Sequence, residues 1–336
     1  MKKWAFLVFM SVISSQILSC TGTKVHKYMK NEIDVILFAP VQYGSHMDIK
    51  SYREIAGELG LTSKEVNHGF INQREEFFDK DGHRKFKVLI LPGGEPHRWF
   101  EQTMGQGLNC QGVMNILELV ESGGSVIAIC VCGSSLFVAH YEKLGPTLEE
   151  AQRKEWDNTH RMPGRFERFC GVHVFKGIVR GPQETNRPYP KTRFLPIKMN
   201  PENEIIREAK LPSTIYQIVV GGGSLIPYEG QPLDAVGWYP NGTVAIGIVP
   251  YGKGKIILSN PHPNIAGQTA MKWALDGVLW DHARRWGWTE QMIAEGRKLI
   301  QTEGDPDGPE PDWALAKAML SYAYKSIKVM LKNGKI

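Results

Sequence analysis

The chain has 336 residues, of which 42% are hydrophobic and 22% charged, so it can bury a sizeable core and is not a mainly disordered protein. Its net charge of +5 comes without any run of lysines and arginines, which argues against a dedicated nucleic-acid-binding protein. Five cysteines are too few for a disulfide scaffold.

The first residues have the pattern of an export signal. Two lysines precede a hydrophobic stretch over residues 4–13, which is too short to span a bilayer. Residues 17–20, of sequence Ile-Leu-Ser-Cys, resemble a bacterial lipobox, whose cysteine is lipidated after cleavage. We therefore expect a lipoprotein signal peptide over residues 1–19, lipidation at Cys20 and a polar tether over residues 20–32. A plain signal peptide with an incidental cysteine is the alternative.

The predicted anchor sets the expected location. Three acyl chains on one cysteine would hold the protein firmly on a membrane. We expect a lipoprotein of the bacterial cell envelope that contacts the membrane through its lipid and faces the periplasm or the exterior.

The first half of the chain alternates strand and helix patterns. Continuous apolar runs are typical of strands that are buried on both faces, and apolar residues three or four apart are typical of helices. The expected elements are a strand over residues 34–39, a helix over 51–59, strands over 86–91 and 125–129 with a helix over 113–120 between them, and a helix opening over 134–140.

The second half is richer in strands and turns. Asn241-Gly242 favours a hairpin turn, and so does the glycine-rich segment 251–254. The expected elements are strands over residues 172–179, 217–220, 235–239, 244–249 and 255–258, a helix over 268–286, a Pro/Gly-rich linker over 304–311, and a last helix that Asp312 caps.

Strands that alternate with helices predict an α/β fold with a doubly wound, mostly parallel sheet and flanking helices. We expect this domain to cover residues 33–287 and to bind its ligand at the carboxyl ends of the strands. A C-terminal helical extension over residues 288–336 would follow the linker. Its helix over residues 312–331 contains no candidate site residue, so we expect truncation after Gln301 to leave a folded domain with its ligand binding intact.

The sharpest local feature is a cysteine at the end of a buried strand. The apolar run over residues 125–129 leads without a break to Cys130, a layout typical of a nucleophile elbow. Backbone N–H groups at the start of a following helix would favour the thiolate. Cys132 could occupy the elbow in another register, but the unbroken strand favours Cys130. A buried structural cysteine is the other interpretation.

Several stretches resemble class I glutamine amidotransferase-like proteins. Residues 123–130 are similar to their glycine-glycine, strand and elbow segment. Residues 91–94, of sequence Leu-Pro-Gly-Gly, are similar to their oxyanion loop, and residues 259–264 to their His-Pro-Glu segment. The resemblance covers about residues 33–285 and implies a flavodoxin-like sheet. It is closest to the biotin-protein ligase N-terminal-domain-like family, whose pattern is similar to the stretches around Tyr216, 221–224 and 251–258.

The resemblance implies roles for individual residues. Cys130 would be the nucleophile and His262 its general base, with Asn264 in the place of the family's carboxylate. Cys132 replaces the usual glycine two residues after the nucleophile. The implied oxyanion hole is formed by Gly93, Gly94 and Val131, and the implied substrate-binding residues are Tyr216, Gly222 and Gly223.

Two functions remain open on the sequence. The first is an exported cysteine-dependent hydrolase of amide C–N bonds with a Cys-His-Asn site, acting on a small-molecule or peptide amide through a thioester. The sequence has no ATP-binding motif, which favours hydrolysis over ammonia transfer. The alternative is a non-catalytic binding lipoprotein that keeps the pocket.

No metal or other cofactor is expected. The histidines lack metal-ligand spacing, as judged at His68, His97, His160 and His173. Cys110 and Cys170 could form a disulfide after export, and the sequence leaves this open.

Overall fold

In the computed structural model of the chain, the described residues are 33–40, 46–93, 108–130, 134, 136–143, 174–181, 192–220, 223–228, 230–231, 233–265, 290–291, 294 and 313–332. The predicted signal peptide with Cys20, the tether, the helix over residues 268–286 and the linker over residues 304–311 lie outside them. Among the described residues, no helix combines the length and the apolar character that crossing a membrane requires.

Five parallel strands form one half of a twelve-stranded sheet. In spatial order they are β2 (Ser63–Val66), β1 (Val35–Phe38), β3 (Val88–Leu91), β4 (Ser125–Ile129) and β12 (Gly254–Ser259). Every residue of β1, β3 and β4 is buried, which explains their continuous apolar sequences. The strands expected over residues 34–39, 86–91 and 125–129 are confirmed.

The other half of the sheet is largely antiparallel. From β12 the order continues through β11 (Val244–Tyr251), β10 (Asp234–Trp238), β7 (Thr192–Met199) and β8 (Thr214–Val220). The turn between β10 and β11 contains Gly242 at a φ of 82°, so the expected hairpin is confirmed.

Three further strands branch from this sheet. They are β5 (Val138–Lys143), β6 (Phe175–Gly181) and β9 (Ser224–Pro227), and β9 joins them to β11. The prediction of a helix over residues 134–140 is wrong for residues 138–140, which belong to β5. Val138 and Tyr141 are β-branched and aromatic, and they pair with β6 in parallel.

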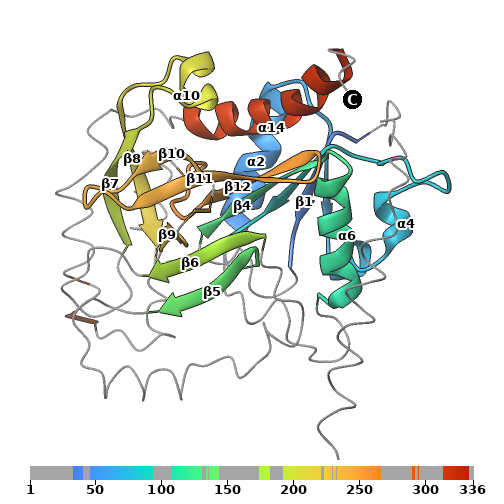
Figure 1. Cartoon of the computed structure of the whole chain (residues 1–336), viewed down its shortest axis with the longest axis horizontal. Coiled ribbons are helices and arrows are strands. Elements are labelled where there is room, and N and C mark those ends of the chain that lie inside the picture. The colour runs from blue at the N-terminus through green and yellow to red at the C-terminus, as the bar shows by residue number, and fades with distance from the viewer. Residues whose placement is uncertain are drawn as a thin grey trace, which may run out of the picture.

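Helices pack against the parallel strands. They are α2 (His46–Glu58), α3 (His68–Ile71), α4 (Arg74–Phe77) and α6 (Cys110–Glu121), with α10 (Glu204–Ala209) near β7 and β8. Figure 1 shows α14 (Ala314–Lys332) lying above the parallel strands and α6 beside and below them. The chain is therefore an α/β protein built on one large mixed sheet.

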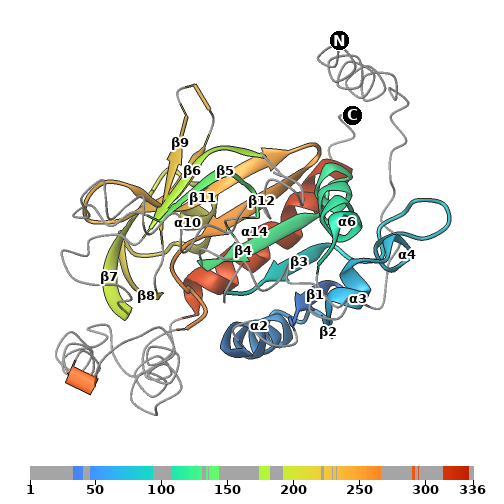
Figure 2. The same cartoon turned by 90° about the horizontal axis from the view of Figure 1, so that it is seen from below.

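The C-terminal helix α14 is part of the hydrophobic core. Its Leu315, Met319 and Leu320 are fully buried, and the helix contacts α2, β3, β4 and β12. Ser125 Oγ donates a hydrogen bond of 3.1 Å to the carbonyl of Ala323. Figure 2 shows α14 running along the parallel strands near β4. The expectation that this helix can be removed without loss of the fold is therefore corrected, because its removal would expose core side chains.

Candidate active site

Cys130 is the first residue after β4 and lies at the carboxyl end of the parallel strands. Its φ of 61° is in the left-handed region, which is strained for a residue with a side chain. Only 6% of its surface is exposed. A strained, buried cysteine at this point of an α/β sheet has the geometry of a nucleophile elbow.

The side chains of the site pack closely around Gly93, which has no side chain of its own. A Cβ atom at Gly93 would lie 2.6 Å from Cε1 of His262, 3.0 Å from Oδ2 of Asp48 and 3.0 Å from Cβ of Cys130. These three side chains therefore surround one point beside the Gly93 backbone. Any residue other than glycine at this position would displace at least one of them.

Asp48 and His262 form a buried pair. Nδ1 of His262 lies 3.0 Å from Oδ1 of Asp48, and the residues are 3% and 0% exposed, respectively. With Nδ1 held by the carboxylate, the imidazole presents Cε1 and Nε2 away from Asp48. The imidazole also has a hydrogen-bonding interaction with the Cys130 side chain, and Nε2 has no other partner among the described residues. This nitrogen is the one available for proton exchange at the site.

Asp48 is held by two further hydrogen bonds. Oδ2 accepts a bond of 2.7 Å from the backbone N–H of Gly93, and Oδ1 accepts one of 2.8 Å from Nδ2 of Asn264. The carboxylate thus ties helix α2 to the loop after β3 and to the loop after β12. A carboxylate with several donors is fixed in position and in its ionised form.

The electrostatics favour an ionised pair. Burial by itself would raise the pKa of Asp48, but the charge of His262 and the three hydrogen bonds lower it below its usual value. Burial by itself would lower the pKa of His262, but the charge of Asp48 and the interactions and hydrogen bonds with Asp48 and Cys130 raise it to about 10. His262 is therefore an imidazolium at neutral pH, and it holds its positive charge beside the Cys130 side chain.

The structure brings together three of the sequence-predicted site residues. Cys130 and His262 meet beside Gly93, as expected. Asn264 also lies at the site, but its amide donates to Asp48 and not to the imidazole. Asn264 therefore positions the acid of the site, and Asp48 takes the place in which the sequence led us to expect Asn264.

The expected oxyanion hole is corrected at Gly93. Its N–H is committed to Asp48, so it is not free to bind an oxyanion. Gly94 and Val131, the other two expected donors, lie outside the described residues, as does Cys132.

The expected substrate-binding residues lie elsewhere on the sheet. Tyr216 is in β8, at the edge of the sheet, and β12, β11, β10 and β7 separate that strand from β4. The carbonyl of Gly223 accepts a hydrogen bond of 3.2 Å from Oη of Tyr239. Gly222 is outside the described residues, and so are Cys170 and the side chain of Cys110. On the sheet, four strands thus separate β8, which contains Tyr216, from the strand that leads to Cys130.

Asp48 is the residue of the candidate site that sequence reasoning missed. It lies in a segment where the expected helix began only at residue 51, whereas α2 begins at His46. One signal could have identified it. An acidic residue shortly after a buried parallel strand lies at the same sheet edge as residues that follow β3 and β4.

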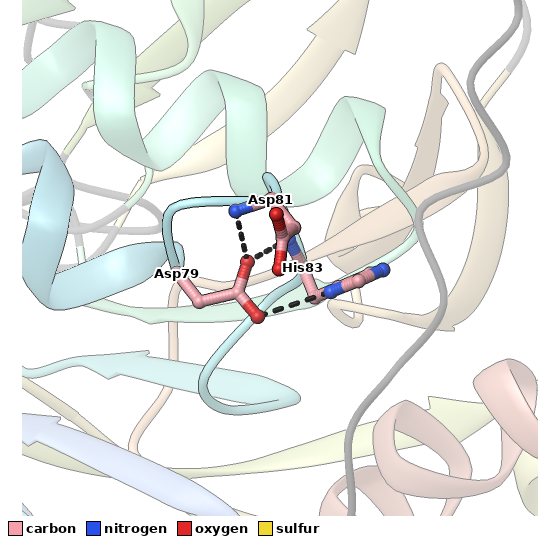
Figure 3. A group of neighbouring side chains, drawn as sticks. All are labelled: Asp79, Asp81 and His83. Atoms are coloured by element: carbon pink, nitrogen blue, oxygen red, sulfur yellow. Dashed lines mark hydrogen bonds and ion pairs between the residues drawn. The ribbon is translucent and has the colours of Figure 1, made fainter.

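A separate cluster contains Asp79, Asp81 and His83 (Figure 3). It is the only group of three that could hold a metal ion among the described residues. Oδ1 of Asp79 accepts backbone hydrogen bonds from Asp81 at 2.9 Å and His83 at 2.8 Å, and Oδ2 lies 3.0 Å from Nδ1 of His83. These bonds close the turn before Arg84, so the turn itself accounts for the grouping.

No protein-family model matches the chain, and a search of curated proteins finds no match. A cytoplasmic protein from Salmonella typhimurium LT2 is similar in structure, with 13% identity and a TM-score of 0.39 over 80% of this chain and 99% of that protein. A ThuA-like protein from Bacteroides uniformis has 11% identity and a TM-score of 0.38 over 70% of this chain and 84% of its own.

A β-galactosidase from Bacillus circulans has 10% identity and a TM-score of 0.38; the match covers 69% of this chain but only 29% of the enzyme. TM-scores this low do not establish a shared fold, so these likenesses carry no argument about function.

Proposed function

We propose that the protein is a cysteine-dependent hydrolase of amide C–N bonds, with Cys130, His262 and Asp48 as nucleophile, acid–base and orienting acid. The observation that carries the proposal is the packing of a strained cysteine against an imidazole whose other side is bonded to a buried carboxylate. This arrangement has the roles of a catalytic triad, which is identified by geometry and not by sequence order.

The chemistry follows from the charges. The Cys130 thiolate attacks the carbonyl carbon of the amide, and a tetrahedral intermediate forms with a negative oxygen. The imidazolium of His262 gives its proton to the leaving nitrogen as the C–N bond breaks, which leaves a thioester. Neutral His262 then takes a proton from water, the resulting hydroxide attacks the thioester, and the carboxylic acid leaves as the thiolate re-forms.

Asp48 supplies the negative charge that Asn264 lacks. An amide in the orienting position cannot stabilise an imidazolium, whereas a carboxylate can. Asp48 carries that negative charge, and Asn264 and Gly93 hold it in place.

We also propose the finer fold assignment. The strand order β2-β1-β3-β4-β12 with parallel pairing supports a doubly wound, flavodoxin-like sheet of the class I glutamine amidotransferase-like type over residues 33–287. The nearest family in this proposal is the biotin-protein ligase N-terminal-domain-like family. The lipid anchor at Cys20 and the cell-envelope location stay proposals from the sequence.

A non-catalytic binding lipoprotein is the second candidate. The observation that favours it is the burial of the site, because Cys130 and His262 are only 6% and 3% exposed. A substrate would have to reach a nucleophile that is nearly closed off from solvent. Cys132, which replaces the family's glycine, also favours the binding protein.

A small chloroketone separates the two candidates. We expect rapid labelling of the wild type at neutral pH, no labelling at this site in Cys130→Ser, and labelling slowed by orders of magnitude in His262→Ala. Cys132→Ala is the matched control and should change the rate only modestly. Equal labelling of Cys130→Ser would reject Cys130 as the nucleophile, and an unreactive wild type would favour the binding protein.

A further inference from the structure

Asn260 directly follows β12, just as Cys130 directly follows the neighbouring strand β4. In the register of the sheet, Leu91 of β3 and Leu258 of β12 both pair with Ala128 of β4. Two residues further along these strands come Gly93, Cys130 and Asn260, respectively. The backbone of Asn260 continues the ladder, because its N–H donates to the carbonyl of Ala245 at 3.1 Å. Adjacent strands are about 4.8 Å apart, so Asn260 flanks Cys130 on the side opposite Gly93.

The side chain of Asn260 points away from α14. Lys255 and its register partner Ser125 both bond to α14, through Oη of Tyr322 and the carbonyl of Ala323. Successive side chains of a strand alternate between the two faces of the sheet. Asn260, five residues after Lys255, is therefore on the other face.

The Asn260 amide is fully buried and unsatisfied. The residue is 0% exposed, and neither Nδ2 nor Oδ1 has a hydrogen-bond partner among the residues that the structure describes. A buried primary amide without partners is destabilising and rare in native proteins. Such a group at the edge of a nucleophile indicates a binding role.

Among the described residues, the oxyanion donor expected at Gly93 is used elsewhere. The N–H of Gly93 is used by Asp48, on the other side of Cys130. Asparagine side chains serve as oxyanion donors in hydrolases. We infer that Nδ2 of Asn260 binds the carbonyl oxygen of the substrate and stabilises its negative charge in the tetrahedral intermediate, while Oδ1 accepts from the N–H of the substrate amide.

The inference rests on the proposed hydrolase and bears on the group that the site recognises. An amide presents one acceptor and one donor, and a neutral carboxamide matches both. A carboxylate group does not match, because Oδ1 of Asn260 and the ionised Asp48 would both repel it. The asparagine therefore favours a neutral amide over a carboxylate at this position.

Two reactions of the same thiol separate this role from the activation of Cys130. Alkylation by iodoacetamide forms no tetrahedral intermediate, so it reports the thiolate alone. Acylation by p-nitrophenyl acetate passes through an oxyanion, and the released p-nitrophenolate gives its rate. In Asn260→Leu we expect acylation to fall by about 10²-fold and alkylation to stay within about twofold of the wild type. Asn260→Ala should behave in the same way and serves if the leucine variant does not fold.

Thermal unfolding gives a further readout. Replacing an unsatisfied buried amide by leucine removes a destabilising group, so the Tm of Asn260→Leu should equal or exceed that of the wild type. Asn115→Leu is the matched control, because Asn115 is also fully buried but its amide donates to the carbonyl of Ile71. The control should lose Tm and keep both rates.

Each outcome has a distinct meaning. Unchanged acylation in both Asn260 variants would overturn the inference, and so would a parallel fall of both rates, which would make Asn260 a packing residue. A wild type that is alkylated quickly but never acylated would also overturn it and leave the reactive thiol intact. A wild type inert to both reagents would reject the proposed hydrolase itself.

Discussion

Gly93→Ala should damage the site more than its size suggests. The new methyl carbon would lie 2.6 Å from the imidazole of His262 and 3.0 Å from both Oδ2 of Asp48 and Cβ of Cys130. None of these neighbours can move freely, because Asp48 holds the imidazole and is itself bonded to Gly93 and Asn264.

The cost can be worked out from these contacts. Overpacking a well-filled interior costs about 1–3 kcal/mol. If the loop shifts instead, the hydrogen bond from Gly93 to the buried carboxylate is lost, which costs about 1.5–3 kcal/mol. We therefore expect Gly93→Ala to lower the free energy of unfolding by about 2 kcal/mol and to slow alkylation of Cys130, because the imidazolium is displaced.

Urea unfolding and the iodoacetamide rate test this prediction, with Gly57→Ala as the control. Gly57 is in α2, and a methyl group there would meet nothing within 4 Å. Alanine at an exposed helix position should stabilise the protein by about 0.5–1 kcal/mol and leave the alkylation rate unchanged. A Gly93→Ala protein with the unfolding midpoint and the alkylation rate of the wild type would refute the described packing of the site.

Four further predictions concern the charges, the core and the anchor. Asp48→Asn should lower the pKa of His262 by removing its carboxylate, and histidine NMR titration should follow the fall from about 10; an unchanged value would contradict the pairing. The wild type should gain most stability from this pair between about pH 4 and 6.5. The Asp48 contribution is lost as pH falls through the lowered pKa of Asp48, and the His262 contribution is lost as pH rises from about 6.5 through the raised pKa of His262. Urea unfolding of the wild type and Asp48→Asn at several pH values measures this difference in stability, and the absence of a maximum in that range would contradict the ionised pair. Leu320→Ala in α14 should lower the free energy of unfolding by about 2–5 kcal/mol, and Lys325→Ala at an exposed position of the same helix by about 0.5 kcal/mol or less, as measured by urea unfolding. Equally small losses in both variants would mean that α14 is a removable extension after all. Cys20→Ser should release the protein from membranes, and mass spectrometry of the mature N-terminus would exclude the anchor if it found an unmodified Cys20.

The parallel half of the sheet could be predicted because burial determines its sequence. Strands covered on both faces need apolar residues at every position, and β1, β3 and β4 have them. The edge strand β2 has the sequence Ser-Lys-Glu-Val and only Val66 is buried, so no apolar run marks it. β7 contains Pro196, and because a proline inside an apolar run argues against a strand, the sequence does not indicate one there.

The candidate site divides in the same way. Cys130 and His262 could be predicted because each belongs to a contiguous motif at the end of a strand. Asp48 comes from a helix more than 200 residues from His262 in sequence, and only the folded sheet brings them together. The commitment of the Gly93 N–H to Asp48 could not be predicted either, since it depends on that same long-range contact.

The most direct test of the central claim is the rate at which iodoacetamide modifies Cys130 at pH 7, with tandem mass spectrometry to locate the label. If the Asp48–His262 pair activates the thiol, Cys130 in the wild type should react much faster than Cys130 in Asp48→Asn, and Cys132→Ala should keep the wild-type rate. Label on Cys132 instead of Cys130, or equal rates in the wild type and Asp48→Asn, would contradict it.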